Sequence, residues 1–425
     1  MNIEQLYELY LQYPSVQTDT RKLKQGDIFF ALKGPNFNGN RFAIQALEAG
    51  AAYVVADEKI LGDDRVIIVD DVLATLQQLA KHHRQQFNIP FIAITGSNGK
   101  TTTKELVSIV LSSHLITYTT LGNLNNHIGV PLTLLSIRKD AEIAVIEMGA
   151  NHQKEIASYC SYTLPTHGII TNCGKAHLEG FGGVEGVRKG KGELFDFLKT
   201  HDGTAIINWD YDYLREMSNG LNRLVKYGTN EGNITGDVIS SEPFLKVQIT
   251  KPSSLETIHT NLVGDYNLPN VLCAVAVGKF FGVPEGMIKA SIENYVPGNS
   301  RSQMIERGSN HIILDAYNAN PSSMKAAIEN FAKIKAGNKV LLLGAMMELG
   351  EESIEEHQKL VDLLQQKDLH NVVLVGGDYE KIEHPYTFFR NSLEAKDWFI
   401  KQNLKDSHIL IKGSRSMQME KVIGE

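Results

Sequence analysis

The sequence predicts an α/β protein built from three domains, and three observations carry that prediction. A chain of 425 residues is too long for a single hydrophobic core. After Pro90, apolar runs such as FIAIT, IAVIEMG and HGIITN alternate with helical segments, which is typical of a parallel sheet with crossover helices. The pattern breaks at residues 297–301 and restarts with HIILDAY, KVLLLGAM, NVVLVGG and HILIKGS.

These breaks divide the chain into three predicted units. Residues 1–85 contain the β-like runs DIFFAL and AAYVVA and a closing helix, LATLQQLAKHHRQQF, which indicates a small α/β domain. Residues 86–297 form a doubly wound central domain with a phosphate-binding loop. Residues 298–425 form a C-terminal Rossmann-like α/β domain. We find no repeat or long linker, so short hinges should join the three domains.

Composition excludes several classes of function. The net charge is −7 and no long basic run occurs, which gives no footprint for nucleic acid. The N-terminus does not resemble a signal peptide, and no stretch of about 18 apolar residues occurs, so we expect no membrane insertion and a cytoplasmic location. Cys160, Cys173 and Cys273 are far apart and lack CxxC spacing, which indicates reduced core residues.

The segment FIAITGSNGKTTTKELVSIVL is the strongest local signal. An apolar strand enters a glycine-rich turn that is followed by Lys100, Thr101 and a helix, the order expected of an ATP phosphate cradle. The usual GxxxxGK[ST] spacing requires glycine at position 94, where Ile94 stands, and the alternative is a plain glycine turn before a helix. The predicted ATP-binding loop comprises Gly96, Ser97, Asn98, Gly99, Lys100, Thr101 and Thr102.

Two polar residues follow strands of the predicted central sheet. Glu147 ends IAVIEMG, and His177 lies just beyond HGIITN, at the carboxyl ends of strands where ligands collect. Taken singly, each is more often a surface carboxylate or a satisfied histidine. Beside a phosphate loop, they become candidate metal contacts.

Three further segments are unusually polar. By composition, Arg188, Lys189 and Lys191 form a solvated basic face at the entry to a helix. Asn267 and Asn270 lie one helical turn apart, where both could face a base edge and one of them could also cap the helix. The last group follows strands of the third domain and consists of Asp315, Tyr317, Asn318 and Asn320, with Lys412 and Arg415 placed similarly after the final strand.

Together these motifs resemble the Mur ligase family over nearly the whole chain. TGSNGKTTT, GNLNNHIGVPLTLL, IEMGAN, KGKGELF, GDYNLPN, DAYNANPSSM and ILIKGSR occur in the order seen in that family. YNANP and QTDTRKLKQGDIFFALKG are similar to the branch that adds D-alanyl-D-alanine to UDP-N-acetylmuramoyl-tripeptide. The resemblance implies those two substrates, ATP and Mg²⁺, an acyl phosphate intermediate and a pentapeptide product used in peptidoglycan synthesis.

The resemblance also implies roles for individual residues. Lys100 and Thr101 would hold the ATP phosphates and Mg²⁺, Glu147 would share that metal, and His177 would serve a second one. Lys191 would be carbamylated and would join Lys100 and His177 as a catalytic residue. The remaining implied contacts are adenine for Asn267 and Asn270, the nucleotide for Arg301 and Asp315, and the peptide and UDP-sugar substrates for Asp19, Thr20, Arg21, Asn123, Asn126, Tyr317, Asn318 and Asn320.

The sequence departs from the family pattern at Asn38, Asn40, His127 and Leu314. The departures at Asn38, Asn40 and His127 bear on the UDP-substrate contacts, and none of the four touches the phosphate loop. Two alternatives stay open, another amide ligase such as a folylpolyglutamate synthetase and an inactive nucleotide-binding regulator. A monomer is expected. The sequence does not distinguish lysine from diaminopimelate as the third residue of the peptide.

Overall fold

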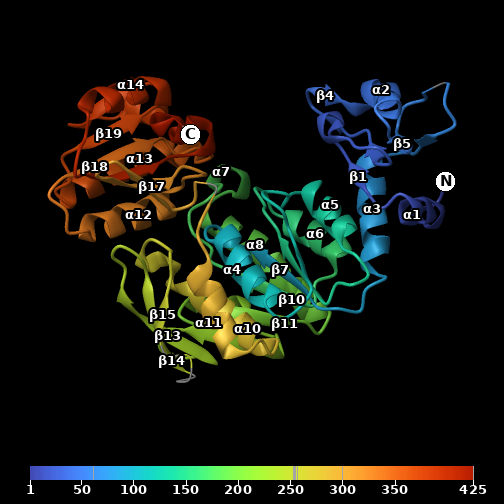
Figure 1. The fold of residues 1–425 in the computed structure, drawn as a ribbon, viewed down its shortest axis with the longest axis horizontal. Helices are drawn as coiled ribbons and strands as arrows, with labels where there is room; N and C mark the ends of the chain where they lie inside the picture. Colours follow the sequence, from blue (N-terminus) through green and yellow to red (C-terminus); the bar gives the residue numbers. More distant parts are fainter. Residues whose placement is uncertain (61, 252–254, 256, 299, 425) are drawn as a thin grey trace.

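The computed structural model describes residues 1–60, 62–251, 255, 257–298 and 300–424. Its strands form three main sheets of four, nine and six strands, one for each part of the chain, and a small two-stranded ribbon. Figure 1 shows the first and last sheets standing on either side above the central one. The α/β class with three domains is therefore confirmed. Of the predicted hinge at residues 297–301, Asn299 lies outside the described residues.

The N-terminal part contains a parallel sheet in the order β1-β2-β5-β6. Its long helix α3 (Val72–Arg84) begins where the Asp71 side chain accepts a hydrogen bond from the Ala74 amide. At its other end, Arg84 donates to the carbonyls of Thr163 and Leu164 and so ties the helix to the central part. The other elements are α1 (Ile3–Gln12), β1 (Val16–Gln17), η1 (Thr20–Lys22), β2 (Ile28–Phe30), β3 (Lys33–Gly34), β4 (Phe37–Asn38), η2 (Gly39–Phe42), α2 (Ala43–Glu48), β5 (Tyr53–Ala56) and β6 (Val66–Ile68).

The central sheet has the order β15-β14-β13-β12-β11-β10-β7-β9-β8. From β8 to β13 all neighbouring strands are parallel, as the alternating sequence pattern predicts. Its elements are β7 (Phe91–Thr95), α4 (Lys100–Ser112), β8 (Thr117–Thr119), α5 (Gly129–Ser136), β9 (Ile143–Glu147), α6 (Glu155–Thr163), β10 (His167–Ile170), α7 (Leu178–Phe181), α8 (Val184–Thr200), β11 (Thr204–Asn208), α9 (Asp212–Met217), β12 (Arg223–Gly228), β13 (Ile234–Ser240), β14 (Lys246–Lys251), β15 (Thr257–His259), η4 (Asp265–Asn267), α10 (Leu268–Phe280) and α11 (Glu285–Asn294).

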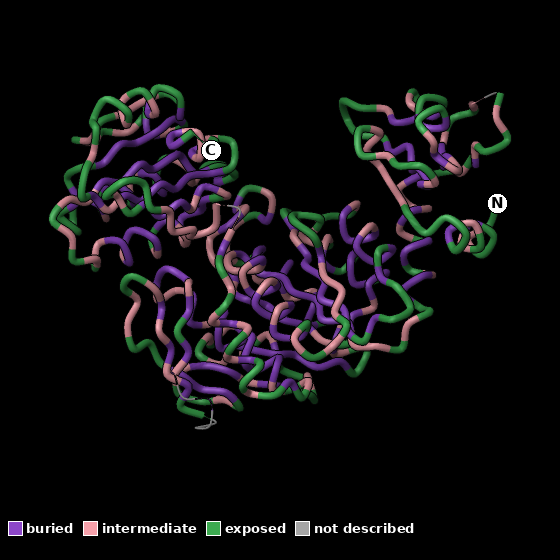
Figure 2. Tube along the Cα trace, viewed as in Figure 1, coloured by how far each residue is buried: buried purple, intermediate pink, exposed green. Residues whose placement is uncertain are grey.

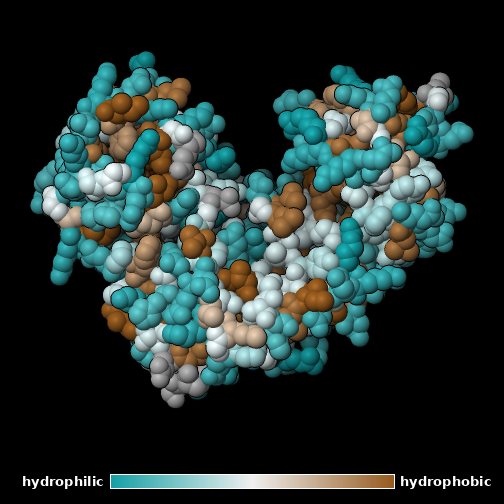
Figure 3. Space-filling view, in the orientation of Figure 1, coloured by the Kyte–Doolittle hydropathy of each residue, from teal (hydrophilic) through white to brown (hydrophobic). Residues whose placement is uncertain are grey.

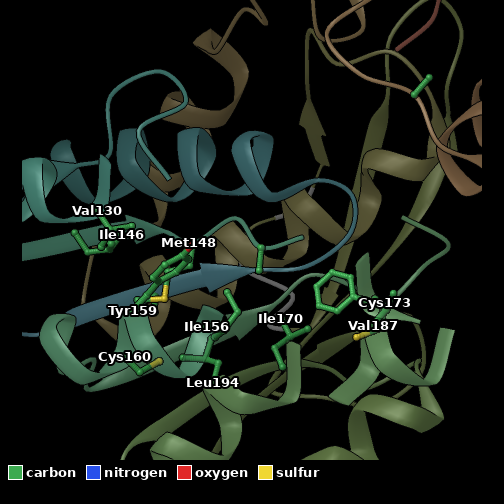
Figure 4. Close-up of a cluster of buried hydrophobic side chains, with 14 of the residues drawn as sticks. Val130, Ile146, Met148, Ile156, Tyr159, Cys160, Ile170, Cys173, Val187 and Leu194 are labelled. Atoms are coloured by element: carbon green, nitrogen blue, oxygen red, sulfur yellow. The ribbon is translucent and has the colours of Figure 1, made fainter. Parts of the chain in front are cut away.

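Both faces of this sheet are buried, because side chains alternate along each strand. In β7, Phe91 and Ala93 join one hydrophobic core, whereas Ile92 and Ile94 join the other. Figure 4 shows part of the first core, where Ile146 and Ile170 of the strands meet side chains from α5, α6 and α8, including Val130, Ile156 and Leu194. The second core is covered by α4, α10 and α11. In Figure 2 the strands of the central sheet are accordingly drawn as buried segments.

An antiparallel extension of the central sheet was not anticipated from the sequence. β14 pairs antiparallel with β13 on one side and with β15 on the other, and these strands extend the sheet beyond β12. Val247 and Ile258 are buried on its inner face, whereas Val238 and Ile239 of β13 are exposed. This mixed alternation is weak in the sequence, and the parallel pattern of the preceding strands hides it.

The C-terminal sheet has the order β16-β17-β21-β18-β19-β20, parallel except for the edge strand β16. Asp315, at the end of β17, lies in register with Lys412, at the end of β21. The elements are β16 (Gln303–Arg307), β17 (Asn310–Asp315), α12 (Pro321–Lys333), β18 (Lys339–Gly344), η5 (Gly350–Glu352), α13 (Ser353–Gln366), β19 (Val372–Val375), η6 (Gly377–Lys381), β20 (Thr387–Phe389), α14 (Ser392–Gln402), β21 (His408–Lys412), η7 (Arg415–Met417) and η8 (Met419–Ile423).

Figure 3 shows a hollow between the N-terminal and C-terminal parts, with the central part as its floor. Among the described residues, no hydrogen bond or ion pair joins residues 1–84 to residues 303–424. None of the described helices has the length and apolar character needed to cross a membrane.

Candidate nucleotide and ligase site

The phosphate loop connects β7 to α4 and depends on two glycines. Gly96 and Gly99 have φ of 143° and 77°, values that residues with a Cβ atom rarely adopt. At Gly96 an added Cβ would lie 2.0 Å from Thr171 Oγ1, so the loop also needs glycine for close packing. Helix α4 then starts at Lys100, and its free amides face the loop.

The end of β10 holds this loop in shape. The Asn98 amide donates to Asn172 Oδ1 at 3.0 Å, and Thr171 Oγ1 donates to the Asn98 carbonyl at 2.6 Å. The Ser97 hydroxyl donates to the Gly174 carbonyl at 2.9 Å. Sequence reasoning missed Thr171 and Asn172, although their place directly after HGII was a usable signal.

Lys100 folds back over the loop. Its Nζ donates to the carbonyls of Gly96 at 2.7 Å and Ser97 at 3.1 Å. Burial, together with nearby Arg301, lowers the pKa of Lys100 to about 8, and Glu147 opposes this shift. A charged lysine held at a loop that presents helix amides forms a strongly positive site, which suits a phosphate group.

Glu147 is buried at the end of β9, with 1% of its surface exposed. Its Oε1 accepts hydrogen bonds from Thr101 Oγ1 at 3.1 Å and Asn125 Nδ2 at 2.7 Å. Its Oε2 is buried and has no hydrogen-bond partner. Asn125 was missed, although it lies within the GNLNN motif between the predicted substrate residues Asn123 and Asn126.

Lys191 is buried rather than solvated. Only 1% of the residue is exposed, and its Nζ donates to the Ala150 carbonyl at 3.0 Å. Burial, reinforced by Lys100, lowers the pKa of Lys191 to about 7. The solvated basic face is therefore wrong for Lys191, while Lys189 is exposed as expected.

The surroundings of Lys191 also differ from expectation. The residue lies in the middle of α8 rather than at a helix entry. The neighbouring Gly190 is closely packed, since an added Cβ would lie 2.4 Å from the Phe181 ring. The Phe181 ring packs against Gly190, and its centre lies 4.8 Å from the Lys191 Nζ.

His177 points to the C-terminal part of the chain. It has a left-handed backbone (φ 53°) at the start of α7, and its Nδ1 lies 2.5 Å from Glu348 Oε2. His177 holds the pKa of the Glu348 carboxyl below its ordinary value. Among the described residues, no group of three or more His, Cys, Asp or Glu could hold a metal ion. A metal here would depend on mixed ligands.

The two asparagines at the start of α10 face one another. Asn270 Nδ2 donates to Asn267 Oδ1 at 2.8 Å, and Asn270 Oδ1 accepts from Thr103 Oγ1 at 3.0 Å. Asn267 occupies the N-cap position, but its side chain makes no capping bond and donates instead to the Val263 carbonyl. The helix-cap alternative is therefore wrong for Asn267.

The loop after β17 brings the C-terminal part against the phosphate loop. Lys412 Nζ donates to Asp315 Oδ2 at 2.6 Å, and the Arg301 guanidinium lies 3.6 Å from the centre of the Tyr317 ring. Asn320 caps α12 by accepting from the Ser323 amide. Its Nδ2 also donates to Asn98 Oδ1 at 2.8 Å, across 222 residues of sequence.

These groups surround one cavity of about 1020 Å³ between the central and C-terminal parts. The predicted site residues that line it are Ser97, Asn98, Gly99, Lys100, Thr101, Thr102, Asn123, Asn126, Glu147, His177, Asn267, Asn270, Arg301, Asp315, Tyr317, Asn318 and Asn320. Gly96 and Lys191 lie just behind its wall, bonded to Lys100 and Ala150 respectively. The fold thus brings predicted site residues from distant segments of the chain to one cavity.

Asp19, Thr20 and Arg21 lie elsewhere, in the N-terminal part. Asp19 caps the short helix η1 and pairs with Arg21, whose side chain is 87% exposed. The hydrogen bond from Arg21 lowers the pKa of Asp19 to about 2. These residues do not line the cavity.

The chain matches models of three Mur ligase domains along most of its length. Residues 12–84 match the Mur ligase family catalytic domain, residues 94–278 the Mur ligase middle domain, and residues 300–415 the Mur ligase glutamate ligase domain. The UDP-N-acetylmuramoyl-tripeptide--D-alanyl-D-alanine ligases of Bacillus subtilis and Escherichia coli are each 36% identical to this chain. Each alignment covers 96% of this chain and 92% of the relative.

Solved structures are similar to the same extent. A crystal structure of MurF from Acinetobacter baumannii superposes with a TM-score of 0.87 at 31% identity, covering 96% of this chain and 92% of its own. MurF ligase from Thermotoga maritima in complex with ADP also gives 0.87, at 28% identity and 97% coverage of both chains. By sequence and by fold, the chain belongs to the Mur ligase family.

Proposed function

We propose that this protein is an ATP-dependent ligase that joins D-alanyl-D-alanine to UDP-N-acetylmuramoyl-tripeptide, forming the pentapeptide precursor of peptidoglycan. The observation that carries the proposal is the near full-length identity of about a third to ligases whose names state this reaction. The cavity adds support, because a phosphate loop and the YNANP loop of that branch meet in it.

The chemistry begins with a poor electrophile, the terminal carboxylate of the tripeptide. A carboxylate oxygen attacks the γ-phosphorus of ATP, the bond to the β-γ bridging oxygen breaks, and ADP leaves with that electron pair. The product is an acyl phosphate. The D-alanyl-D-alanine amine then attacks the acyl carbon, the C–O bond to phosphate breaks, and the amine loses one proton as inorganic phosphate departs. No enzyme nucleophile is required.

The chain's own contribution is positioning and electrostatic stabilisation. Lys100 and the first amides of α4 would neutralise charge that develops on the transferred phosphoryl group. Arg301 reaches the same cavity from the hinge before β16. Asn267 and Asn270 would offer paired amide groups to an adenine edge. Asp315, whose carboxylate is oriented by the hydrogen bond from Lys412, would contact the nucleotide.

A magnesium ion fits one corner of the cavity. Glu147 Oε2 is a buried, unpartnered carboxylate oxygen, and the Thr101 hydroxyl lies against the same carboxylate. Hard oxygen ligands of this kind suit Mg²⁺, which when bound would neutralise phosphate charge. His177 is the candidate contact for a second metal, as the family resemblance implies.

Lys191 suits carbamylation. The modification requires a neutral amine, and burial already brings the pKa of Lys191 to about 7. A carbamate would replace a buried cation by an anion near the metal corner. We therefore expect Lys191→Ala to be nearly inactive and to regain part of its activity with formate or acetate. A fully active Lys191→Ala enzyme would contradict this role.

Other parts of the proposal rest on family resemblance. Asp19, Thr20 and Arg21 would hold the UDP-sugar end, while Asn123, Asn126, Tyr317, Asn318 and Asn320 would contact the peptide substrates. We infer domain boundaries near residues 85 and 297, a monomer and a cytoplasmic location.

A direct assay tests the function. Purified protein is incubated with ATP, Mg²⁺, D-alanyl-D-alanine and UDP-tripeptide containing either lysine or diaminopimelate. We expect ADP, phosphate and UDP-pentapeptide, with phosphate release only when both peptide substrates are present. Formation of AMP and pyrophosphate would eliminate the mechanism, and the absence of any turnover would favour a nucleotide-binding regulator.

A further inference from the structure

The segment after β10 contacts two other regions of the site at once. On one side, Thr171 and Asn172 bond the phosphate loop. On the other, the Lys175 amide donates to Ser322 Oγ at 3.0 Å, at the start of α12 in the C-terminal part. Gly174 packs closely here, since an added Cβ would lie 2.9 Å from the same hydroxyl. The segment of residues 171–175 therefore contacts both the phosphate loop and the start of α12.

Lys175 adds an ion pair to this contact. Its Nζ lies 2.6 Å from Glu356 Oε1, on α13 of the C-terminal part. The Glu356 side chain is only 5% exposed, and its pKa is lowered by hydrogen bonds from Lys175 and Lys359, against the effect of burial. A short pair with one buried partner has a more defined geometry than a surface pair. Lys175 is not among the residues that line the cavity.

We propose that Lys175 is a positioning residue for ligation. Its ion pair with Glu356 fixes the C-terminal part over the phosphate loop, and thereby sets the distance between the acyl phosphate and the residues that present D-alanyl-D-alanine. The proposal rests on the proposed function. It concerns a side chain to which neither the motifs nor the comparisons assign a role.

The structure supplies its own matched control. Lys359 also pairs with Glu356 Oε1, at 3.0 Å, but it belongs to the same helix as Glu356. Both lysines are partly exposed, at 38% and 52% of the side chain. Removing either leaves the buried carboxylate one cationic partner, so neither substitution leaves Glu356 unpaired. Only Lys175→Met breaks a link between two parts of the molecule.

The kinetic test compares Lys175→Met, Lys175→Gln and Lys359→Met in full-length protein. We expect both Lys175 variants to lose about ten-fold in kcat/KM for D-alanyl-D-alanine, because small misplacement of a reacting group is costly. The KM for UDP-tripeptide should stay unchanged, and Lys359→Met should resemble wild type. In a Glu356→Gln background, Lys175→Met should have no further effect. Equal effects of the two lysines, or an undiminished effect in that background, would overturn the proposal.

A distance measurement separates this proposal from the function on which it rests. Spin labels on Asn230→Cys and Gln402→Cys report the separation of the central and C-terminal parts, since both positions are exposed and the native cysteines are buried. Lys175→Met should broaden the distance distribution, and Lys359→Met should not. If wild type fails to ligate D-alanyl-D-alanine, the proposed function fails, yet this measurement still decides the docking role. An unchanged distribution in Lys175→Met would refute it.

Discussion

At the scale of single residues, the surroundings of each lysine decide its role. The sequence alone placed Lys100 in the phosphate loop, Lys191 on a solvated basic face and Lys412 after the final strand. The structure separates them: Lys100 bonds loop carbonyls, Lys191 a single buried carbonyl, and Lys412 a carboxylate. Burial cannot be read from the local pattern KGKGE, because it depends on Phe181 and other residues that fold over it.

Lys100 should be needed for activity and dispensable for folding. Its side chain bonds only carbonyls of its own loop, so Lys100→Ala should leave the protein folded. Turnover should fall by at least about 100-fold, as when one preorganised electrostatic contact is removed. Steady-state kinetics and thermal unfolding measure the two effects. Near-normal turnover would mean that the phosphate-loop assignment is mistaken.

Lys191 should make stability depend on pH. Its folded pKa is about 7, whereas an unfolded lysine titrates near 10.4. Between these values the unfolded chain binds more protons, so this lysine's destabilising effect is complete below about pH 7 and fades as pH rises. In bicarbonate-free buffer, Lys191→Met should therefore raise the melting temperature more at pH 6 than at pH 9. The same increase at both pH values would show that the pKa of Lys191 is not lowered.

At the scale of elements, local sequence patterns placed most strands and helices. FIAIT became β7, IAVIE became β9 and HGII became β10, because a buried parallel strand is a short apolar run. Contacts between elements were not predictable. The pair Asn98 and Asn320 joins loops 222 residues apart. Because asparagine is common in turns for local conformational reasons, neither residue indicated a distant partner. The antiparallel strands β13 to β15 were missed because their alternation is weak.

The N-terminus of α12 combines a structural and a functional role, which a paired substitution can separate. Asn320 caps α12 and bonds Asn98, whereas Asn391 caps α14 through the amides of Leu393 and Glu394 and is remote from the cavity. Each asparagine-to-alanine change should cost about 1 kcal/mol of stability. Only Asn320→Ala should also lower kcat/KM, by about ten-fold. Chemical denaturation and kinetics test both, and equal activity in the two variants would limit Asn320 to capping.

At the scale of the whole molecule, the sequence predicted three α/β parts but not their arrangement. Relative placement depends on side chains such as Arg84 and Lys175, whose partners lie on other elements. As arranged here, the N-terminal part that would hold the UDP-sugar faces the C-terminal part across a hollow (Figure 3). An acyl phosphate in such an open site would meet water, which hydrolyses it. Ligation therefore requires this hollow to narrow during the reaction.

Substrate binding should make the protein more compact. A compact chain of 425 residues has a radius of gyration of about 22 Å, and an open arrangement exceeds that value. In small-angle X-ray scattering, the radius of gyration of the free protein should exceed this value, and UDP-tripeptide alone should change it little. UDP-tripeptide together with a non-hydrolysable ATP analogue should reduce the radius towards the compact value. The analogue supplies phosphate contacts on Lys100 and on the side of Arg301, so it favours the closed state by its differential affinity. A radius that is unaffected by both ligands together would mean that water is excluded by the bound substrates themselves, without domain closure.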